Sequence, residues 1–316
     1  MSTHCAIAIP TYNRARQVHR AVAAALAQSY DDLAVVVIDD GSTDETAAAL
    51  APFFEHPQFT YVQIKRNAGT GKAKNLALAL APFDAITFHD SDDLPHRDKL
   101  LLQQRALALP GVMAHECLNW AVAGKQAGQR LDVDVVLTHH ELVRADGSVF
   151  RIARTLSMVD DFFPQLQMAA GPPGDWILVN SGLFRRDVFA RIGGYDDTIK
   201  EDRDLRNRVI MSGSVVWVVD RPLLTKIETP DSLTVGNETN YASGRRARER
   251  EAIWSRIEAW KRTGEVPPVA LDLADVEIGF VSRPGQFAVA RDIPMTNATR
   301  AHLQAVLQPW TGRAAA

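Results

Sequence analysis

Short apolar runs alternate with segments of helical periodicity through the first third of the chain. The runs that predict strands are residues 5–9, 33–38, 60–64 and 85–88. Between them, residues 18–26 and 71–80 repeat apolar side chains at helical spacing. Because strands that alternate with helices in this way form parallel β-α-β units, the pattern predicts a parallel sheet with helices on both faces.

The pattern changes after residue 110. Residues 133–143 and 149–152 predict a β-hairpin that turns on Asp146-Gly147, so the parallel winding stops there. The later predicted elements are helices at residues 186–192 and 202–211 and a strand at residues 214–220. An antiparallel hairpin after parallel units indicates a mixed sheet.

The chain becomes more charged beyond residue 235. Residues 244–262 predict a charged helix. Its apolar stripe consists of Ile253, Trp254, Ile257 and Trp260. Pro267-Pro268 then breaks the chain, and residues 276–281 and 286–290 are expected to pair around a turn. This extension either packs on the preceding domain or forms a subunit contact in a homodimer.

Composition limits the partners of this protein. The 316 residues are 46% hydrophobic and 23% charged, which is ordinary for a globular chain with a packed core. A formal net charge of -3 argues against nucleic acid as the main partner. Cys5 and Cys117 are too few for a disulfide framework, the first residues lack a secretory signal, and no apolar run is long enough to span a membrane. We therefore expect a cytoplasmic protein with at most peripheral membrane contact.

Three carboxylates stand directly after the apolar run 85–88: those of Asp90, Asp92 and Asp93. Carboxylates this close repel one another unless a cation or hydrogen-bond donors hold them ionised. Oxygen ligands of this kind suit Mg²⁺ or Mn²⁺, and open α/β sheets bind ligands beyond the carboxyl ends of their strands. The alternative is a solvated acidic turn before a helix that is expected to begin near Pro95.

A second acidic pair, Asp39 and Asp40, ends the second apolar run. Ser42 and Glu45 follow with the spacing of a capping box, which predicts a helix reaching about Leu50. That box accounts for the serine and the glutamate but not for the two aspartates before it. Each aspartate either caps the helix or contacts a ligand at the edge of the sheet.

Several of these segments together resemble the family 2 glycosyltransferases, which are inverting enzymes of the GT-A fold. The segments are Pro10-Thr11-Tyr12-Asn13-Arg14, Val37-Ile38-Asp39-Asp40-Gly41-Ser42-Thr43-Asp44, Asn67-Ala68-Gly69 with Asn75, Asp90-Ser91-Asp92-Asp93, Gly193-Gly194-Tyr195-Asp196 and Glu201-Asp202. They occur in the order typical of the family over about residues 4–235. Each is weak alone, but their combination is specific.

The resemblance implies an α/β protein of GT-A fold, with a Rossmann-like three-layer α/β/α mixed sheet. It implies a glycosyltransferase domain at residues 1–235, with a nucleotide-binding half at 1–110 and an acceptor-binding half at 111–235. Residues 236–316 then add a C-terminal helix and a short extension.

For the donor, the resemblance implies a UDP-sugar. Asp40 would accept a hydrogen bond from the imide N–H of uracil, a donor that cytosine lacks, and the backbone around Pro10 and Thr11 would line the base. The other residues assigned to the donor are Tyr12, Asn13, Arg14, Asn67, Gly69, Lys72, Lys74, Asp90 and Ser91. In the alternative, the two lysines belong to a solvated face of their helix.

The resemblance makes Asp90-Ser91-Asp92 the DXD motif of the family, with Asp92 as the favoured metal ligand and Asp93 able to share that role. Mn²⁺ or Mg²⁺ held there would bridge the donor diphosphate and neutralise charge as the sugar–phosphate bond breaks. One departure concerns the segment after the last sheet strand, where many members have a histidine. Residues 225–232 contain none, which leaves Lys226 as a phosphate contact or Glu228 as a metal ligand.

For the chemistry, Glu201-Asp202 resembles the Glu-Asp motif of the family, whose aspartate is the proposed general base. Asp202 would take the proton of the acceptor hydroxyl as its oxygen attacks the anomeric carbon, and the reaction would invert that carbon. In the alternative, both carboxylates are first-turn charges that complement a helix dipole. Trp176 matches the place where acceptors lie in the family, and a core tryptophan is its alternative.

Other classes of function make different demands on the sequence. A non-catalytic sugar-nucleotide or protein-binding module would keep Asp40 and lack a base, whereas Asp202 is present. A sugar nucleotidyltransferase would have a glycine-rich loop after its first strand, and residues 10–14 contain no glycine. The acceptor stays open among glycans, lipid-linked sugars, proteins and small metabolites.

Overall fold

The computed structural model describes residues 3–109, 112–113, 130–152, 182–198, 201–228 and 244–311. The first half of its main sheet consists of β1 (Cys5–Thr11), β2 (Leu33–Asp39), β3 (Phe59–Ile64) and β4 (Ala85–Phe88). These strands are parallel and stand in the order β3-β2-β1-β4. The helices that connect them are α1 (Ala15–Leu26), α2 (Thr46–Leu50) with the 3-10 turn η1 (Ala51–Phe53), and α3 (Thr70–Leu80). The strands and helices predicted for this region are therefore confirmed.

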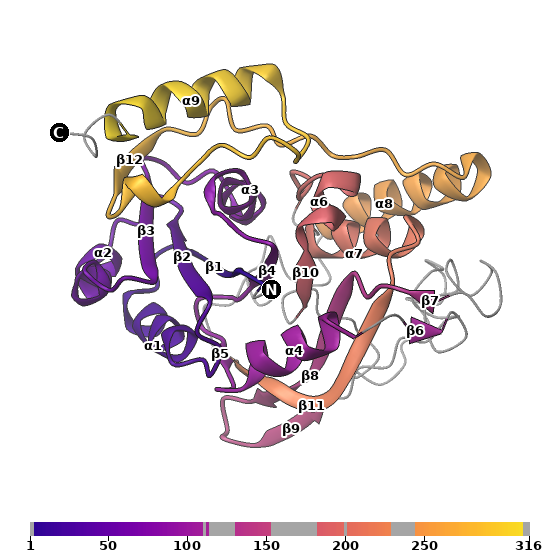
Figure 1. Ribbon diagram of the computed structural model, residues 1–316, viewed down its shortest axis with the longest axis horizontal. Coiled ribbons are helices and arrows are strands. Elements are labelled where there is room, and N and C mark those ends of the chain that lie inside the picture. The colour runs from indigo at the N-terminus through magenta and orange to yellow at the C-terminus, as the bar shows by residue number, and fades with distance from the viewer. Residues whose placement is uncertain are drawn as a thin grey trace.

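The continuous apolar runs arise because helices cover both faces of these strands (Figure 1). Side chains alternate between the faces, so Ile7 and Ile9 of β1 join the core beneath α1, whereas Ala6 and Ala8 join the core beneath α3. Small residues on the second face leave room for the apolar side of α3, where Leu76 and Leu80 are fully buried.

The second half of the sheet is mixed. Its strands are β5 (Leu94–Pro95), β8 (Val135–Val143), β9 (Val149–Ile152), β10 (Leu183–Arg185) and β11 (Val216–Ile227), and a separate pair is formed by β6 (Val112–Met113) and β7 (Arg130–Leu131). The hairpin of β8 and β9 forms as predicted. Strand β10 runs antiparallel to β4 and β8, and β11 runs parallel to β8. The helices are α4 (Lys99–Leu107), α6 (Arg186–Ile192) and α7 (Glu201–Met211).

Two predictions of helix starts were wrong. The helix expected from Pro95 begins at Lys99, because Pro95 belongs to β5 and pairs with Leu224 of β11. The capping box is also absent, since α2 begins at Thr46 and Ser42 lies outside it. The hydroxyl of Ser42 instead accepts a hydrogen bond from the amide of Asn13 at 2.8 Å, so this serine joins two loops.

The C-terminal extension contains α8 (Gly244–Thr263), β12 (Ile278–Val281), the 3-10 turn η5 (Pro284–Gln286) and α9 (Asn297–Thr311). The pairing expected between residues 276–281 and 286–290 was wrong, because β12 joins the main sheet antiparallel to β3. Helix α9 was not predicted. Leu271 and Leu303 are buried in the same core as Leu76 of α3, so the extension packs on the domain.

Helix α8 uses the predicted apolar stripe. Ile253, Ile257 and Trp260 form a buried cluster against Met211 of α7.

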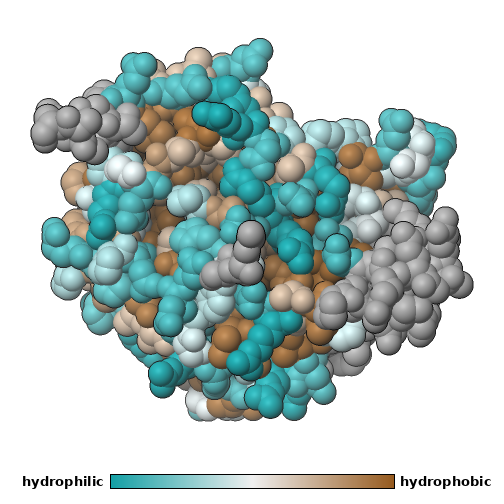
Figure 2. Space-filling view, in the orientation of Figure 1, coloured by the Kyte–Doolittle hydropathy of each residue, from teal (hydrophilic) through white to brown (hydrophobic). Residues whose placement is uncertain are grey.

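The surface of the molecule is largely polar on the face that Figure 2 shows, with apolar residues in separated patches. Among the residues that the structure describes, no helix has both the length and the hydropathy needed to cross a membrane.

Candidate active site

Three loops meet at the edge of the sheet where parallel strands end. The amide N–H of Asp40 donates to the carbonyl oxygen of Thr11 at 2.8 Å, and that of His89 donates to Ala8 at 3.0 Å. These pairings align the segments that follow β1, β2 and β4 along one edge. Asp40 and the acidic residues after His89 therefore lie at the same edge of the sheet, the one where the parallel strands end, as the sequence predicts.

The loops after β1 and β2 are joined by side chains of the two motifs. Asn13 has a left-handed backbone with φ of 51°, a conformation that asparagine tolerates better than most residues. Its Oδ1 accepts a hydrogen bond from the amide of Thr43 at 2.8 Å. Asp44 Oδ2 accepts from the amide of Ala15 at 3.2 Å. Asn13 and Asp44 therefore hold the two loops in register, which is a structural role within the motifs.

Asp40 connects the loop after β2 to the loop after β3. It is 3% exposed, and its two oxygens accept hydrogen bonds from the amides of Ala68 at 2.7 Å and Gly69 at 2.9 Å. Burial raises the pKa of Asp40 to about 6, although the two amides oppose the rise. Gly41 has φ of 77°, and a Cβ there would lie 2.8 Å from the backbone of Arg66. Glycine at this position therefore allows the loop after β3 to approach the backbone of residue 41 closely.

Asp39 has a structural environment. Its Oδ1 accepts a hydrogen bond from the amide of Ser42 at 2.8 Å, and its Oδ2 accepts one from the hydroxyl of Tyr61 at 2.5 Å. Both of its oxygens thus stabilise the end of β2. Asp39 therefore does not cap α2, which begins at Thr46, and its carboxylate instead orders the turn after β2.

Asp90, Asp92 and Asp93 converge. Each offers a carboxylate oxygen, and these oxygens all lie within 4.8 Å of one another. Burial raises the pKa of Asp93 well above its usual value, and burial together with the charge of Asp90 raises the pKa of Asp92. Both oxygens of Asp93 are buried without a hydrogen-bond partner in the described part of the chain. The arrangement calls for a cation.

Lys226 of β11 is a cation that the chain itself supplies at this cluster. Its Nζ lies 3.1 Å from Asp90 Oδ2 and 3.6 Å from Asp93 Oδ2. Glu228 lies elsewhere, because its carboxylate accepts a hydrogen bond from the amide of Ala145 at 3.4 Å. Of the two residues singled out in the segment without histidine, only the lysine contacts the acidic cluster.

Glu201 and Asp202 begin α7 and contact a buried lysine of α3. Lys74 is 1% exposed, and its Nζ lies 2.7 Å from Asp202 Oδ1 and 3.3 Å from Glu201 Oε1. Burial lowers the pKa of Lys74, but Asp202 and Glu201 outweigh that effect, so the pKa stands well above its usual value. Burial, and then the charge of Asp202, raise the pKa of Glu201 to about 7.

The segment Gly193-Gly194-Tyr195-Asp196 packs on α3 through Asn75. Asn75 Nδ2 donates to the carbonyl of Tyr195 at 2.8 Å, and the amide of Tyr195 donates to Asn75 Oδ1 at 2.7 Å. A Cβ at Gly194 would lie 2.3 Å from the same Asn75 oxygen. Asn75 therefore sets the position of the chain just before α7.

The remaining residues predicted for the donor and acceptor sites differ in their exposure and in their contacts. Lys72 forms an ion pair with Asp275 of the extension at 2.6 Å. Tyr12 and Asn67 are exposed, Pro10 and Ser91 are buried, and Arg14 is close enough to Asp92 to lower its pKa. Trp176, the predicted acceptor residue, lies outside the described residues.

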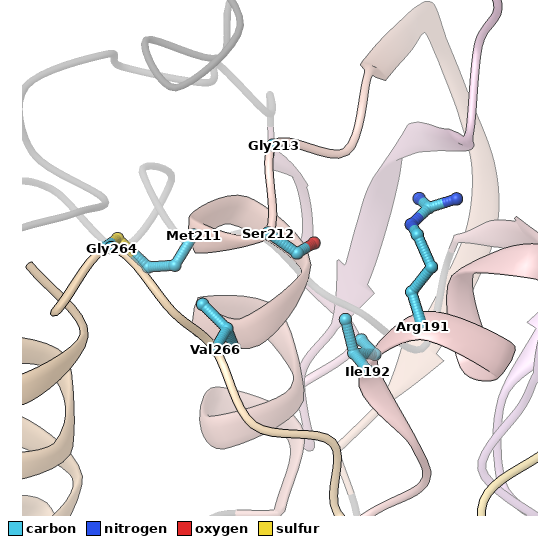
Figure 3. Close-up of a pocket in the computed structure, with 7 residues that line it drawn as sticks. All are labelled: Arg191, Ile192, Met211, Ser212, Gly213, Gly264 and Val266. Atoms are coloured by element: carbon cyan, nitrogen blue, oxygen red, sulfur yellow. The ribbon is translucent and has the colours of Figure 1, made fainter.

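A cavity of about 360 Å³ lies away from the carboxylates (Figure 3). It is lined by Arg191, Ile192, Met211, Ser212, Gly213, Gly264 and Val266. Met211 is the last residue of α7, whereas Asp202 is in its first turn, so roughly 14 Å of helix separates the two. The guanidinium of Arg191 is already bonded to Asp134 at 3.0 Å. The cavity therefore does not coincide with the site predicted from the sequence.

Arg256 of α8 is a site-supporting residue that sequence reasoning missed. It forms ion pairs with Asp196 at 2.5 Å and with the buried Asp204 of α7 at 2.9 Å. These contacts fix the segment before Glu201 to the extension. No motif signals this arginine, because α8 lies beyond the region of resemblance.

The mixed sheet, with acidic residues at the edge where its parallel strands end, has the architecture of the GT-A fold. The sequence profile described as "Glycosyl transferase family 2" matches residues 6–113. The glycosyltransferase GlyG of Streptococcus pneumoniae serotype 4 is 30% identical over 292 residues, which cover 89% of this chain and 87% of GlyG. The chain belongs to glycosyl transferase family 2.

Comparison with solved structures agrees at the level of the fold. The mannosyltransferase PcManGT from Pyrobaculum calidifontis, in complex with GDP-Man and Mn2+, has a TM-score of 0.52 and 22% identity, over 84% of this chain and 66% of that one. TarS 1-349 of S. aureus, in complex with UDP-GlcNAc, has a TM-score of 0.52 and 18% identity, over 72% of this chain and 59% of that one.

The chain spans 17% to 35% of the length of the first curated relatives that it matches.

Proposed function

We propose that this protein transfers a sugar from a UDP-sugar to a hydroxyl acceptor, with inversion at the anomeric carbon. The observation that carries the proposal is the electrostatic link between two acidic groups. Lys74 contacts Asp202 directly, and the charge of Asp90 also contributes to the raised pKa of Lys74. The predicted base and Asp90, the first aspartate of the DXD motif, therefore act on the same lysine, as expected if they belong to one site.

The acidic cluster fits a divalent cation. Its donors are all carboxylate oxygens, which suit Mn²⁺ or Mg²⁺, and Asp93 presents two buried oxygens without hydrogen-bond partners among the described residues. Asp92 and Asp93 would hold the ion together with Asp90. When bound, such an ion supplies Lewis-acid help to the departing diphosphate.

Asp202 suits the role of general base. Its side chain is 39% exposed, so an acceptor can reach it, and Lys74 engages Oδ1, which leaves Oδ2 for the acceptor hydroxyl. In this mechanism Asp202 removes the hydroxyl proton as the acceptor oxygen attacks the anomeric carbon on the face opposite the diphosphate. Glu201 shares Lys74 with Asp202 and so helps to fix the lysine.

Asp40 supports the choice of uridine. It lies at the edge of the sheet with Thr11, and each of its oxygens keeps a second lone pair besides the one used by Ala68 or Gly69. A uracil imide N–H can use that lone pair. Guanosine is the main alternative, because one structural neighbour was solved with GDP-Man and another with UDP-GlcNAc.

A thermal-shift panel tests the donor. The protein is heated with UDP, GDP or CDP, each with and without Mn²⁺. We expect a shift with UDP that Mn²⁺ enlarges, because a ligand at about 100 times its dissociation constant stabilises the fold by about 2.7 kcal/mol. Equal shifts with all three nucleotides would reject the role of Asp40, and a GDP-selective shift would replace UDP by GDP in the proposal.

The variant Asp202→Asn tests the base. We expect transfer to fall by about 10² to 10⁴-fold while UDP binding is kept, since general-base catalysis is typically worth that much. Transfer is measured as UDP release during a screen of UDP-sugars and acceptors. Asp197→Asn is the matched control, because Asp197 is exposed on the segment that precedes α7 and should leave transfer unchanged. Undiminished transfer by Asp202→Asn would exclude it as the base.

A further inference from the structure

Lys226 reaches the acidic cluster through backbone pairing. Strand β5 directly follows Asp93 and is antiparallel to β11, with Leu94 opposite Thr225 and Pro95 opposite Leu224. In an antiparallel ladder, the next opposed positions are Asp93 and Lys226. On its other side, Lys226 is in register with Leu142 of β8. The sheet therefore places the backbone of Lys226 beside Asp93, independently of the charges around it.

The surroundings of Lys226 show what this position does. Asp93 is 1% exposed, and a buried carboxylate is costly unless a counter-charge accompanies it. The ammonium of Lys226 lies 3.1 Å from Asp90 Oδ2 and 3.6 Å from Asp93 Oδ2, so it neutralises part of the acidic cluster from within the chain.

We propose that Lys226 is a built-in counter-ion of the acidic cluster, and that a divalent cation must compete with it for Asp90 and Asp93. This inference rests on the proposed function, in which these carboxylates hold Mn²⁺ or Mg²⁺. An ammonium and a divalent ion on the same carboxylates repel each other strongly in a partly buried site. Binding of the ion therefore requires the lysine side chain to move away from its present position.

Two consequences follow for ion and donor binding. Without a donor, the cluster binds a divalent ion more weakly than the same site would with a neutral residue at position 226. With a donor, the displaced ammonium meets a new anion, because a lysine is a good point-charge partner for phosphate. The ion and the nucleoside diphosphate should then bind more tightly together than separately, which is a coupling between two ligands.

The variant Lys226→Met tests the competition, because methionine keeps a long unbranched side chain and removes the charge. Mn²⁺ affinity is measured in the absence of nucleotide by the electron paramagnetic resonance signal of free Mn²⁺. We expect the variant to bind Mn²⁺ at least about tenfold more tightly than the wild type, since the competing charge is gone. Lys226→Arg keeps the charge and should bind Mn²⁺ no more tightly than the wild type. Equal or weaker Mn²⁺ binding by Lys226→Met would overturn the competition.

Lys65→Met is the matched control. It removes the same charge from an exposed side chain, and we expect its Mn²⁺ affinity to stay within about twofold of the wild type, because solvent and salt screen charges at a distance. If Lys226→Met does not fold, Lys226→Gln is measured in its place, and a larger rise in melting temperature with Mn²⁺ than the wild type shows would support the inference.

Failure of the competition can be distinguished from failure of the proposed function. Wild-type protein that binds Mn²⁺ with an affinity insensitive to position 226 rejects only the competition. If neither wild type nor variant binds Mn²⁺, with or without UDP, both the competition and the cation in the proposed function are rejected.

Discussion

Asp40 shows how one buried carboxylate serves both the fold and the predicted donor site. Its oxygens accept two backbone hydrogen bonds from the loop that leads into α3, so an ionised Asp40 orders that loop. The same burial raises its pKa from 3.8 to about 6. Between these two pH values the Asp40 carboxyl is protonated in the folded protein but ionised in the unfolded chain. The contribution of Asp40 to stability therefore depends on pH.

The sign of that dependence gives a prediction for Asp40→Asn. Because the folded pKa lies above the unfolded value, the contribution of Asp40 to stability is fully present below pH 3.8 and is lost as the pH rises through about 6. We expect the free energy of unfolding of the wild type, relative to the variant, to fall by up to roughly 3 kcal/mol between pH 4 and pH 7. Urea denaturation at each pH measures it.

A difference that is flat across this range would contradict the raised pKa of Asp40. Asp197→Asn is the matched control, because it makes the same substitution at an exposed position.

At the scale of elements, α3 links the two predicted halves of the site. Gly69 directly precedes the helix and contacts Asp40, Lys74 contacts Asp202, and Asn75 holds the backbone of Tyr195. A single short helix therefore sets the distance between the predicted nucleotide contact and the predicted base. Lys74 is buried for this reason, so the alternative in which it belongs to a solvated helix face is not observed.

Elements with a strong local pattern could be predicted from the sequence. Strands β1 and β2 are covered on both faces, so nearly every residue is apolar and the pattern has no competing interpretation. The pairing of β5 with β11 and of β12 with β3 could not be predicted in this way, because each partner lies far along the chain. Helix α9 did carry a signal, since Leu303 and Leu307 are one turn apart and both are buried.

The residues of the candidate site also differ in how far the sequence could predict them. The positions of Asp40 and Asp90 could be predicted, since each follows a strand of a parallel sheet and such strands end at one edge. The partners of Lys74 and Lys226 could not, because α7 and β11 reach them only through the assembled sheet and the packing of helices on it. The sequence could single out Lys74 and Lys226 as candidate site residues. Which carboxylates they contact depends on the tertiary structure.

At the scale of the whole molecule, the extension and the sheet share one core. Val269 forms a backbone bridge with Gly193, where a Cβ would lie 1.9 Å from the Val269 carbonyl oxygen, so glycine is required for the contact. Leu271 packs against Gly194 of the same segment. The extension thus supports the segment that leads to Asp202, and the fold should unfold as one unit.

A pair of neighbouring substitutions on α9 tests this unity. Leu303 is fully buried in the core shared with α3, whereas Gln304 is exposed on the same helix. We expect Leu303→Ala to lower the free energy of unfolding by about 2–5 kcal/mol through lost burial and the cavity it leaves, and Gln304→Ala to change it by less than about 0.5 kcal/mol. Circular dichroism and tryptophan fluorescence should report one coincident transition for both variants. If Leu303→Ala instead produced a separate early transition with the rest unchanged, the extension would be an independent unit, and its contacts with Gly193 and Gly194 would not be needed to hold Asp202 in place.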